Sequence, residues 1–491
     1  MALSYVDNPQ VQKNRWRILT AVGLFTFMST LDGSIVNIAL PVMSRDLKIP
    51  MNQAEWIVSI YLIMIICALL LFGKIGDAFG KVKVFKIGTF LFVIGTFLFV
   101  IGTFLFVIGS LLCGFNGGLP LLLGARVVQA LGASMTMSNN NGIITEVFPL
   151  KERGRALGLT GSFVALGSIA GPGIGGLILA HFSWGYIFWI NVPIGILTII
   201  FGHFILPKDI VKTHEKIDYA GVASFAVLIV SLFLGIFIGQ QIGFTSPIIL
   251  AAFVVALISA GIFVWIEQHV EQPLLSFRLF KNIDFSLSLL CAFLIFIVNF
   301  FFNVISPFYL ENALGLAPNL AGYSLMIFPI VQVVVAPIAG SISDRIGPEM
   351  LTFIGLVLIS ISQVGYMLMN LQTPIWLFMF FVGLVGLGNG IFQAPNNTIV
   401  MSSVGVEDLG IAGGINALAR NLGMAFGISL STTVLYAAMS RNYGQKVTGY
   451  IPGHANVFIA GMHDAFMVAL VICLIATALT GWRMLKHRKI A

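Results

Sequence analysis

Fourteen long apolar runs, separated by short polar segments, set the hydrophobic pattern of the chain. Each run is close to the roughly 20 residues that a helix needs to cross a bilayer. The runs do not alternate between apolar and polar positions, which predicts transmembrane helices rather than barrel strands. The expected spans are residues 17–41, 52–72, 84–113, 118–142, 156–180, 185–206, 218–239, 246–267, 284–310, 320–340, 350–370, 375–401, 411–438 and 464–482.

Composition also indicates a membrane protein with many spans. Hydrophobic residues make up 58% of the 491 positions and charged residues only 9%, which lies far outside the range of soluble globular domains. The four cysteines all fall in apolar runs, where a small core residue is a better interpretation than a disulfide or a metal ligand. We therefore expect no metal site. These cysteines are Cys67, Cys113, Cys291 and Cys473.

Basic residues indicate how the spans are oriented. If both termini are cytoplasmic, twenty of the 26 Lys and Arg residues fall in cytoplasmic segments, as the positive-inside rule requires. The opposite side then carries only Arg45, Lys48, Arg441 and Lys446. This asymmetry accounts for the net charge of +7, and no arginine-rich tail suggests a nucleic-acid partner. We expect a multi-pass protein of the cytoplasmic membrane with both termini inside.

Two loops of similar sequence indicate an internal repeat. GKIGDAFGKVK, from Gly73 to Lys83, and GSISDRIG, from Gly340 to Gly347, each place an Asp four residues after a Gly. Because these loops follow the second and the tenth span, two extra spans must lie in the middle of the chain. The predicted fold class is an all-α polytopic membrane protein with two six-helix bundles and two central linker helices. The expected parts are a cytoplasmic N-terminus (1–16), an N-terminal bundle (17–206), a linker with two helices (207–283), a C-terminal bundle (284–482) and a cytoplasmic tail (483–491).

Four motifs resemble those of a known family. LDGSIVNIALP (31–41) lies in the first span, GKIGDAFGKVK in the loop after the second, ARVVQALGA (125–133) in the fourth and GSIAGPGIGG (167–176) in the fifth. Together they resemble the major facilitator superfamily, specifically its fourteen-helix drug:proton antiporter branch of the EmrB/QacA type, over essentially the whole chain. The resemblance implies the major facilitator fold and alternating-access export of hydrophobic or cationic compounds. It further implies a bacterial, monomeric carrier that uses the proton gradient, needs no cofactor and is not an enzyme.

The motifs suggest roles for particular residues. In the fifth span, small residues allow close helix approach and the proline allows a kink. In the loops, the charged side chains form a latch at a cytoplasmic gate or, alternatively, only a turn with positive-inside anchoring. The antiporter-motif residues are Gly167, Gly171, Pro172, Gly175 and Gly176, and the gate residues are Gly73, Gly76, Asp77, Gly80, Lys81, Asp344 and Arg345.

One acid lies deep in the first predicted span. An ionised carboxylate is costly there, so we expect Asp32 to exchange a proton for a cationic or polar ligand. At 1.5 Å per residue Asp32 and Arg126 lie at a similar depth, and Gln129 follows Arg126 by one turn. We expect the three to form one polar network that responds to protonation; the alternative is that Arg126 and Gln129 only tie helices together. No other acid is expected deep in a span.

Polar residues in the second half are candidates for substrate contacts. Asn299 and Asn303 share one face of the ninth predicted span, and Gln332 lies between two prolines of the tenth. Hydrogen bonds between helices are an equally good interpretation for each of them. Arg420, in the thirteenth span, has no obvious acidic partner and its function is open. A cavity rich in Phe and Met would suit loosely specific binding of apolar cations.

The third predicted span contains one sequence three times. GTFLFVI repeats without change from Gly88 to Ile108, which gives an apolar run of about 30 residues where roughly 20 suffice. The simplest interpretation is a tandem duplication. A change of copy number that tunes transport is the alternative.

Other functions fit the same fold. One alternative is a proton-coupled exporter of a metabolite or fatty acid. Another is a facilitator or importer, which would share the architecture but run without a proton gradient. The sequence contains no phosphate-binding loop of the Walker type and no H-E-x-x-H pair, so coupling to nucleotide hydrolysis is not indicated. The expected partners are small substrates, protons and the lipid bilayer.

Overall fold

The regular structure of this chain is helical. The computed structural model describes residues 5–93, 118–207, 218–270, 273–405 and 409–488, and within these ranges it contains no strand. This confirms the predicted all-α class. The first half contains η1 (Tyr5–Asp7), α1 (Pro9–Asp46), α2 (Met51–Ala54), α3 (Trp56–Phe79), α5 (Gly118–Val147), α6 (Leu150–His181), α7 (Tyr186–Trp189), α8 (Asn191–Ile205), α9 (Tyr219–Ile242) and α10 (Pro247–His269).

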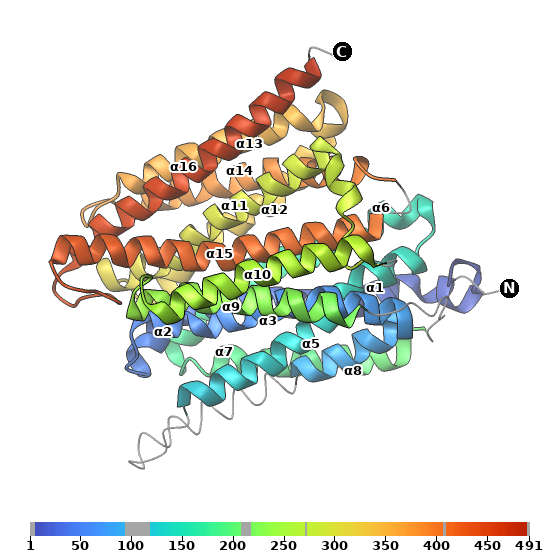
Figure 1. Ribbon diagram of the computed structural model, residues 1–491, viewed down its shortest axis with the longest axis horizontal. Helices are drawn as coiled ribbons and strands as arrows, with labels where there is room; N and C mark the ends of the chain where they lie inside the picture. The colour runs from blue at the N-terminus through green and yellow to red at the C-terminus, as the bar shows by residue number, and fades with distance from the viewer. Residues whose placement is uncertain (1–4, 94–117, 208–217, 271–272, 406–408, 489–491) are drawn as a thin grey trace. The chain divides into compact units, whose positions relative to one another are not determined.

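The described residues of the second half of the chain also form helices (Figure 1). It contains η2 (Phe277–Lys281), α11 (Ile283–Phe308), the π-helical turn η3 (Tyr309–Ala313), α12 (Pro318–Ile346), α13 (Pro348–Met367), α14 (Ile375–Ser402), α15 (Leu409–Tyr443) and α16 (Ala455–Arg488).

Local signals set several helix ends. Asp218 caps α9 by accepting a hydrogen bond from the backbone N–H of Gly221 at 2.9 Å, and Asn282 caps α11 in the same way. Such caps satisfy donors that a helix leaves unpaired at its first turn. Gly243 and Gly347 end α9 and α12 with positive φ angles of 97° and 86°, a conformation that glycine adopts without strain.

The helices coincide with the predicted spans. Thirteen of the fourteen spans correspond to described helices, and eleven helices in the described part are long and apolar enough to cross a membrane. For the third span, residues 81–93 are helical. Its remainder, which holds most of the GTFLFVI repeat, lies outside the described residues, so the length of this span stays a prediction.

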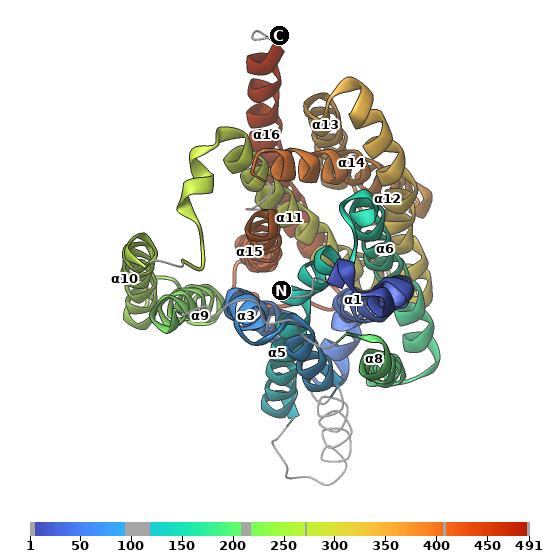
Figure 2. The same ribbon diagram turned by 90° about the vertical axis from the view of Figure 1, so that its right-hand side faces the viewer.

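Two compact units divide the chain. The first unit comprises Met1–Val36, Trp56–Gly171 and Phe182–Leu275. In it, α3 packs against α5 and α9, and α9 packs against α10. Figure 2 shows α9 between α3 and α10. The ring centroids of Trp56 and Phe237 lie 4.9 Å apart where α9 meets the start of α3, so α9 is packed on α3.

Helix α10 keeps one face uncovered. Large apolar side chains along it are exposed, among them Ile248, Leu257 and Trp265. A helix that leaves such a face uncovered is suited to contact with lipid.

The second unit comprises Asn37–Glu55, Pro172–His181 and Ser276–Ala491. Its main helix pairs are α12 with α14, α13 with α14, α11 with α15, and α13 with α16. Helix α1 passes from the first unit to the second after Val36, and α6 passes after Gly171. Two of the long helices of the first half therefore contribute to both units.

Candidate functional site

Asp32 and Arg126 form a fully buried ion pair within the first unit. Both side chains are 0% exposed, and Nη1 of Arg126 donates to Oδ2 of Asp32 at 2.6 Å. Asp32 is supplied by α1 and Arg126 by α5. A charge in an apolar interior is retained only with a partner, and here each ion neutralises the other.

Two amides complete the surroundings of the carboxylate. Gln129, one turn after Arg126 on α5, accepts a hydrogen bond from Nη1 of Arg126 and donates from Nε2 to Oδ1 of Asp32 at 3.2 Å. Asn191, the first residue of α8, donates from Nδ2 to the same oxygen at 2.8 Å. The structure therefore brings together all three residues of the expected network and adds a fourth.

Helix α3 holds the guanidinium in place. Nε of Arg126 donates to the backbone oxygen of Ile57 at 3.0 Å, and the guanidinium carbon lies 4.3 Å from the ring centroid of Tyr61. These contacts fix the arginine independently of its acidic partner.

Asn191 was not identified from the sequence. It stands alone between apolar residues within the predicted span 185–206, and an isolated amide in such a run signals an interhelical hydrogen bond. Its partner could not be inferred, because Asn191 and Asp32 are 159 positions apart.

Three further acids are buried, although none of them lies deep in a predicted span. Glu55, Glu267 and Glu311 are 0%, 4% and 5% exposed. All three lie near helix ends, where hydropathy places a span boundary. Glu55 follows the short helix α2, Glu267 lies in the last turns of α10, and Glu311 lies in the turn η3 that extends α11. The chain folds over these carboxylates after the apolar run has ended.

Small residues of the antiporter motif bring α6 close to α1. A Cβ on Gly167 would lie 2.6 Å from the backbone oxygen of Phe27 and 2.9 Å from Cβ of Thr30. Gly171 faces Ser34 with equally little space, and Oγ of Ser34 donates to the backbone oxygen of Gly167 at 3.1 Å. This is the close helix approach that the glycines predict.

The rest of this motif belongs to the second unit. Pro172 lies inside α6, and Gly175 and Gly176 follow it. A Cβ on Gly176 would lie 2.8 Å from the backbone oxygen of Pro318 at the start of α12, so this half of the motif also serves close packing.

Gly167→Val is expected to destabilise the protein. The added side chain has no room against α1, and overpacking of this kind costs about 1–3 kcal/mol. Gly33→Ala is the control, because a Cβ at Gly33 meets nothing within 4 Å. Thermal unfolding in detergent should give a lower midpoint for Gly167→Val and an unchanged or higher one for Gly33→Ala. Equal tolerance of both substitutions would contradict the packing described here.

The residues predicted to form a cytoplasmic gate are only partly described. Gly73, Gly76 and Asp77 lie in the last turns of α3, and Gly80 breaks the helix with φ of 110°. Lys81 forms an ion pair with Glu146 of α5 at 2.8 Å. The side chains of Asp77, Asp344 and Arg345 lie outside the described part of the chain, so the latch stays a prediction.

The polar candidates of the second half have mixed surroundings. Asn299 and Asn389 exchange two hydrogen bonds, at 2.7 and 3.0 Å, between α11 and α14. Asn303 donates to the backbone oxygen of Asn299 at 2.9 Å, and Gln332 is half-buried in α12. Asn299 thus ties two helices together. Arg420, on α15, is also half-buried and forms no hydrogen bond or ion pair with any residue that the structure describes.

A polytopic helical protein with a buried ion pair and closely packed glycine motifs has the architecture of a secondary transporter. The Major Facilitator Superfamily model matches residues 22–428 and 287–489. The chain belongs to this superfamily and is therefore a multi-pass membrane transporter rather than an enzyme.

Individual relatives differ in their cargo. The chain is 34% identical over 478 residues to the riboflavin transporter RibZ of Clostridioides difficile (strain 630), with coverage of 97% of this chain and 99% of the relative. It is 26% identical over 442 residues to the multidrug resistance protein Stp of Mycobacterium tuberculosis (strain CDC 1551 / Oshkosh), with coverage of 89% and 80%. The structure of the peptide transporter POT in complex with sulfate matches with a TM-score of 0.66 at 14% identity, covering 98% and 96% of the two chains. This last likeness concerns the fold.

Proposed function

We propose that this protein is a proton-coupled exporter of hydrophobic organic compounds, cations foremost, and a member of the fourteen-helix drug:proton antiporter branch. The observation that carries the proposal is the ion pair of Asp32 and Arg126, which is fully buried and closed by Gln129 and Asn191. A carboxylate in such a site has two competitors for its charge, a proton and a cationic cargo. Exchange of one for the other is the chemistry of an antiporter.

In this proposal both termini are cytoplasmic and the carrier works as a monomer in a bacterial cytoplasmic membrane. Proton binding at Asp32 releases Arg126 from its partner and favours a different arrangement of α1 and α5. The energy comes from the proton gradient, without a cofactor. Asp32, Asn299, Asn303 and Gln332 are the candidate residues for contact with the cargo. The similarity to multidrug resistance proteins supports export as the direction.

A metabolite carrier, with riboflavin or a related flavin as cargo, is the second candidate. It is favoured by the 34% identity to a riboflavin transporter along nearly the whole chain. Arg420 also suits it, because a guanidinium without a partner among the described residues can bind a polar or acidic group of a cargo.

Everted membrane vesicles with an acidic lumen test both functions. Ethidium should accumulate in the lumen against its own gradient, and nigericin, which collapses the pH difference, should abolish the accumulation. Equilibration without accumulation would indicate a facilitator and contradict the proposal. Accumulation of riboflavin but not ethidium would select the second candidate.

A further inference from the structure

Glu55 is a buried acid that the proposed exchange at Asp32 does not use. It lies between α2 and α3, in the segment Asn37–Glu55 of the second unit, and is 0% exposed. Its Oε1 accepts a hydrogen bond from the hydroxyl of Tyr436 on α15 at 3.0 Å. Its Oε2 has no hydrogen-bond partner among the described residues. The carboxyl group therefore joins this segment to α15 at a place closed to solvent.

Hydroxyl groups are the polar neighbours of Glu55. Besides Tyr436, the side chain of Thr432, one turn earlier on α15, lies next to the carboxyl group. Glu55 forms no ion pair with any described residue. An ionised carboxylate without a cation is very costly in such a place, whereas a neutral carboxylic acid is not. Asp32 is the opposite case, because Arg126 balances its charge.

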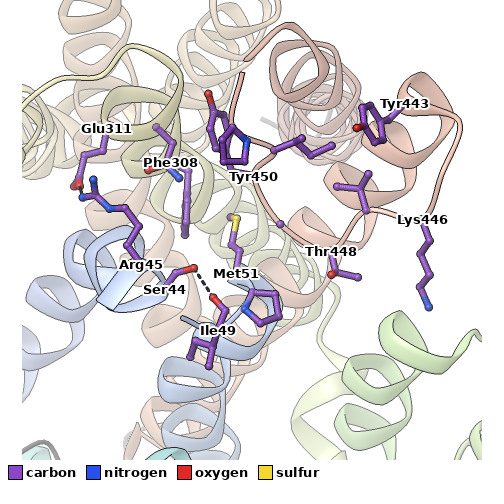
Figure 3. A pocket seen from close by; sticks show the side chains of 16 residues that line it. Ser44, Arg45, Ile49, Met51, Phe308, Glu311, Tyr443, Lys446, Thr448 and Tyr450 are labelled. Carbon is purple, nitrogen blue, oxygen red and sulfur yellow. Dashed lines mark hydrogen bonds and ion pairs between the residues drawn. The ribbon is translucent and has the colours of Figure 1, made fainter. Parts of the chain in front are cut away.

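A cavity lies one helical turn away from this acid. It has a volume of about 600 Å³ and contains Met51 in its lining (Figure 3). The backbone N–H of Glu55 donates to the oxygen of Met51 at 3.0 Å, so the two residues are one helical turn apart on the same face. The charged residues that line the cavity are Arg45, Glu311 and Lys446. Arg45 and Glu311 form an ion pair with each other at 3.4 Å.

We propose that Glu55 is a proton-binding site that controls whether the segment Asn37–Glu55 docks on α15. With a proton bound, the neutral side chain can be buried against Tyr436; without it, the charge favours separation and contact with water. Docking is thus linked to the uptake of one proton. The physiological direction of this linkage rests on the proposed orientation of the protein. In that orientation the proton comes from outside the cell, and external acid favours docking.

Spin labels can measure docking directly in the full-length protein. Lys48 and Gln445 are exposed positions on the two sides of this contact, and both can be replaced by labelled cysteines in a background that lacks the native ones. Double electron–electron resonance then gives the fraction of protein with the short distance between the labels. In the wild-type background this fraction should rise as pH falls, with a change of up to about tenfold in the ratio of docked to undocked protein per pH unit.

Two variants identify the responsible group. Glu55→Gln keeps the size of the side chain and the acceptor for Tyr436 but cannot titrate, so its docked fraction should be high and independent of pH. Glu311→Gln is the control, because it neutralises another buried acid of the same unit, and it should keep the pH response. A pH response that survives in Glu55→Gln, disappears in Glu311→Gln, or follows Na⁺ instead of pH would overturn the proposal. This readout needs no transport, so it fails or succeeds separately from the proposed antiport.

Infrared spectroscopy covers the case in which Glu55→Gln does not fold. The spectrum should contain the C=O band of a protonated carboxyl group that shifts to higher frequency in Tyr436→Phe, because the hydrogen bond to the carboxyl oxygen is lost. A carboxyl region that Tyr436→Phe leaves unchanged would show that Glu55 is ionised in the docked state and would overturn the proposal.

Discussion

Asp32→Asn is expected to abolish uphill export while the protein remains inserted in the membrane. The amide has the size of the carboxyl group and can still accept a hydrogen bond from Asn191, but it neither binds nor releases a proton. A carrier that exchanges one proton for one monovalent cation can sustain a concentration ratio of about ten between the vesicle lumen and the medium for each unit of pH difference. This ratio should fall to that of vesicles without the protein.

Asp464→Asn is the matched control for this loss. Asp464 pairs with Arg441 at 2.5 Å, but the arginine side chain is 73% exposed, and an exposed ion pair contributes little. The control should transport like the wild type. Substantial uphill export by Asp32→Asn would remove Asp32 from the coupling mechanism.

Arg126→Met is expected to destabilise the protein strongly and to stop transport. The substitution leaves Asp32 as a buried acid without a cation, and breaking a buried ion pair from one side costs about 3–5 kcal/mol. The free energy of unfolding, measured by denaturant titration in detergent, should fall by this amount near neutral pH. Arg441→Met, which affects the exposed pair, should change it by less than about 1 kcal/mol.

The double variant separates stability from function. Asp32→Asn/Arg126→Met removes both charges at once, so it should recover much of the lost stability, because no unbalanced ion remains. It should still not transport, since the titratable group is gone. A double variant no more stable than Arg126→Met alone would show that the arginine acts through its contacts with Ile57 and Tyr61 rather than through the ion pair.

Hydropathy was sufficient to predict the fold because lipid imposes helices on long apolar runs. Helices α9 and α10 occupy the part of the chain where the repeated loop motif predicts two additional spans, and their role as linkers between two bundles stays a prediction. The approach of α6 to α1 followed from the glycines of the motif. In each case a local pattern determines the structure directly.

The candidate site was predictable only in part. Counting depth along two helices placed Asp32 near Arg126, because the membrane supplies a common reference plane. Asn191 was missed because nothing in the sequence says which amide faces a given acid. Glu55 and Glu311 were missed because their burial depends on how the chain folds beyond the ends of the apolar runs.

Proton release on cargo binding tests the central claim most directly. Ethidium is titrated into the purified, weakly buffered protein, and protons released are counted per ethidium bound, with Glu55→Gln as a background in which docking does not contribute. We expect one proton to leave Asp32 for each ethidium that binds when this carboxyl group starts out protonated. Under these conditions the affinity for ethidium should weaken about tenfold for each unit by which the pH falls. Asp32→Asn should release no proton. Binding without proton release in the wild type, or equal release in Asp32→Asn, would contradict the account.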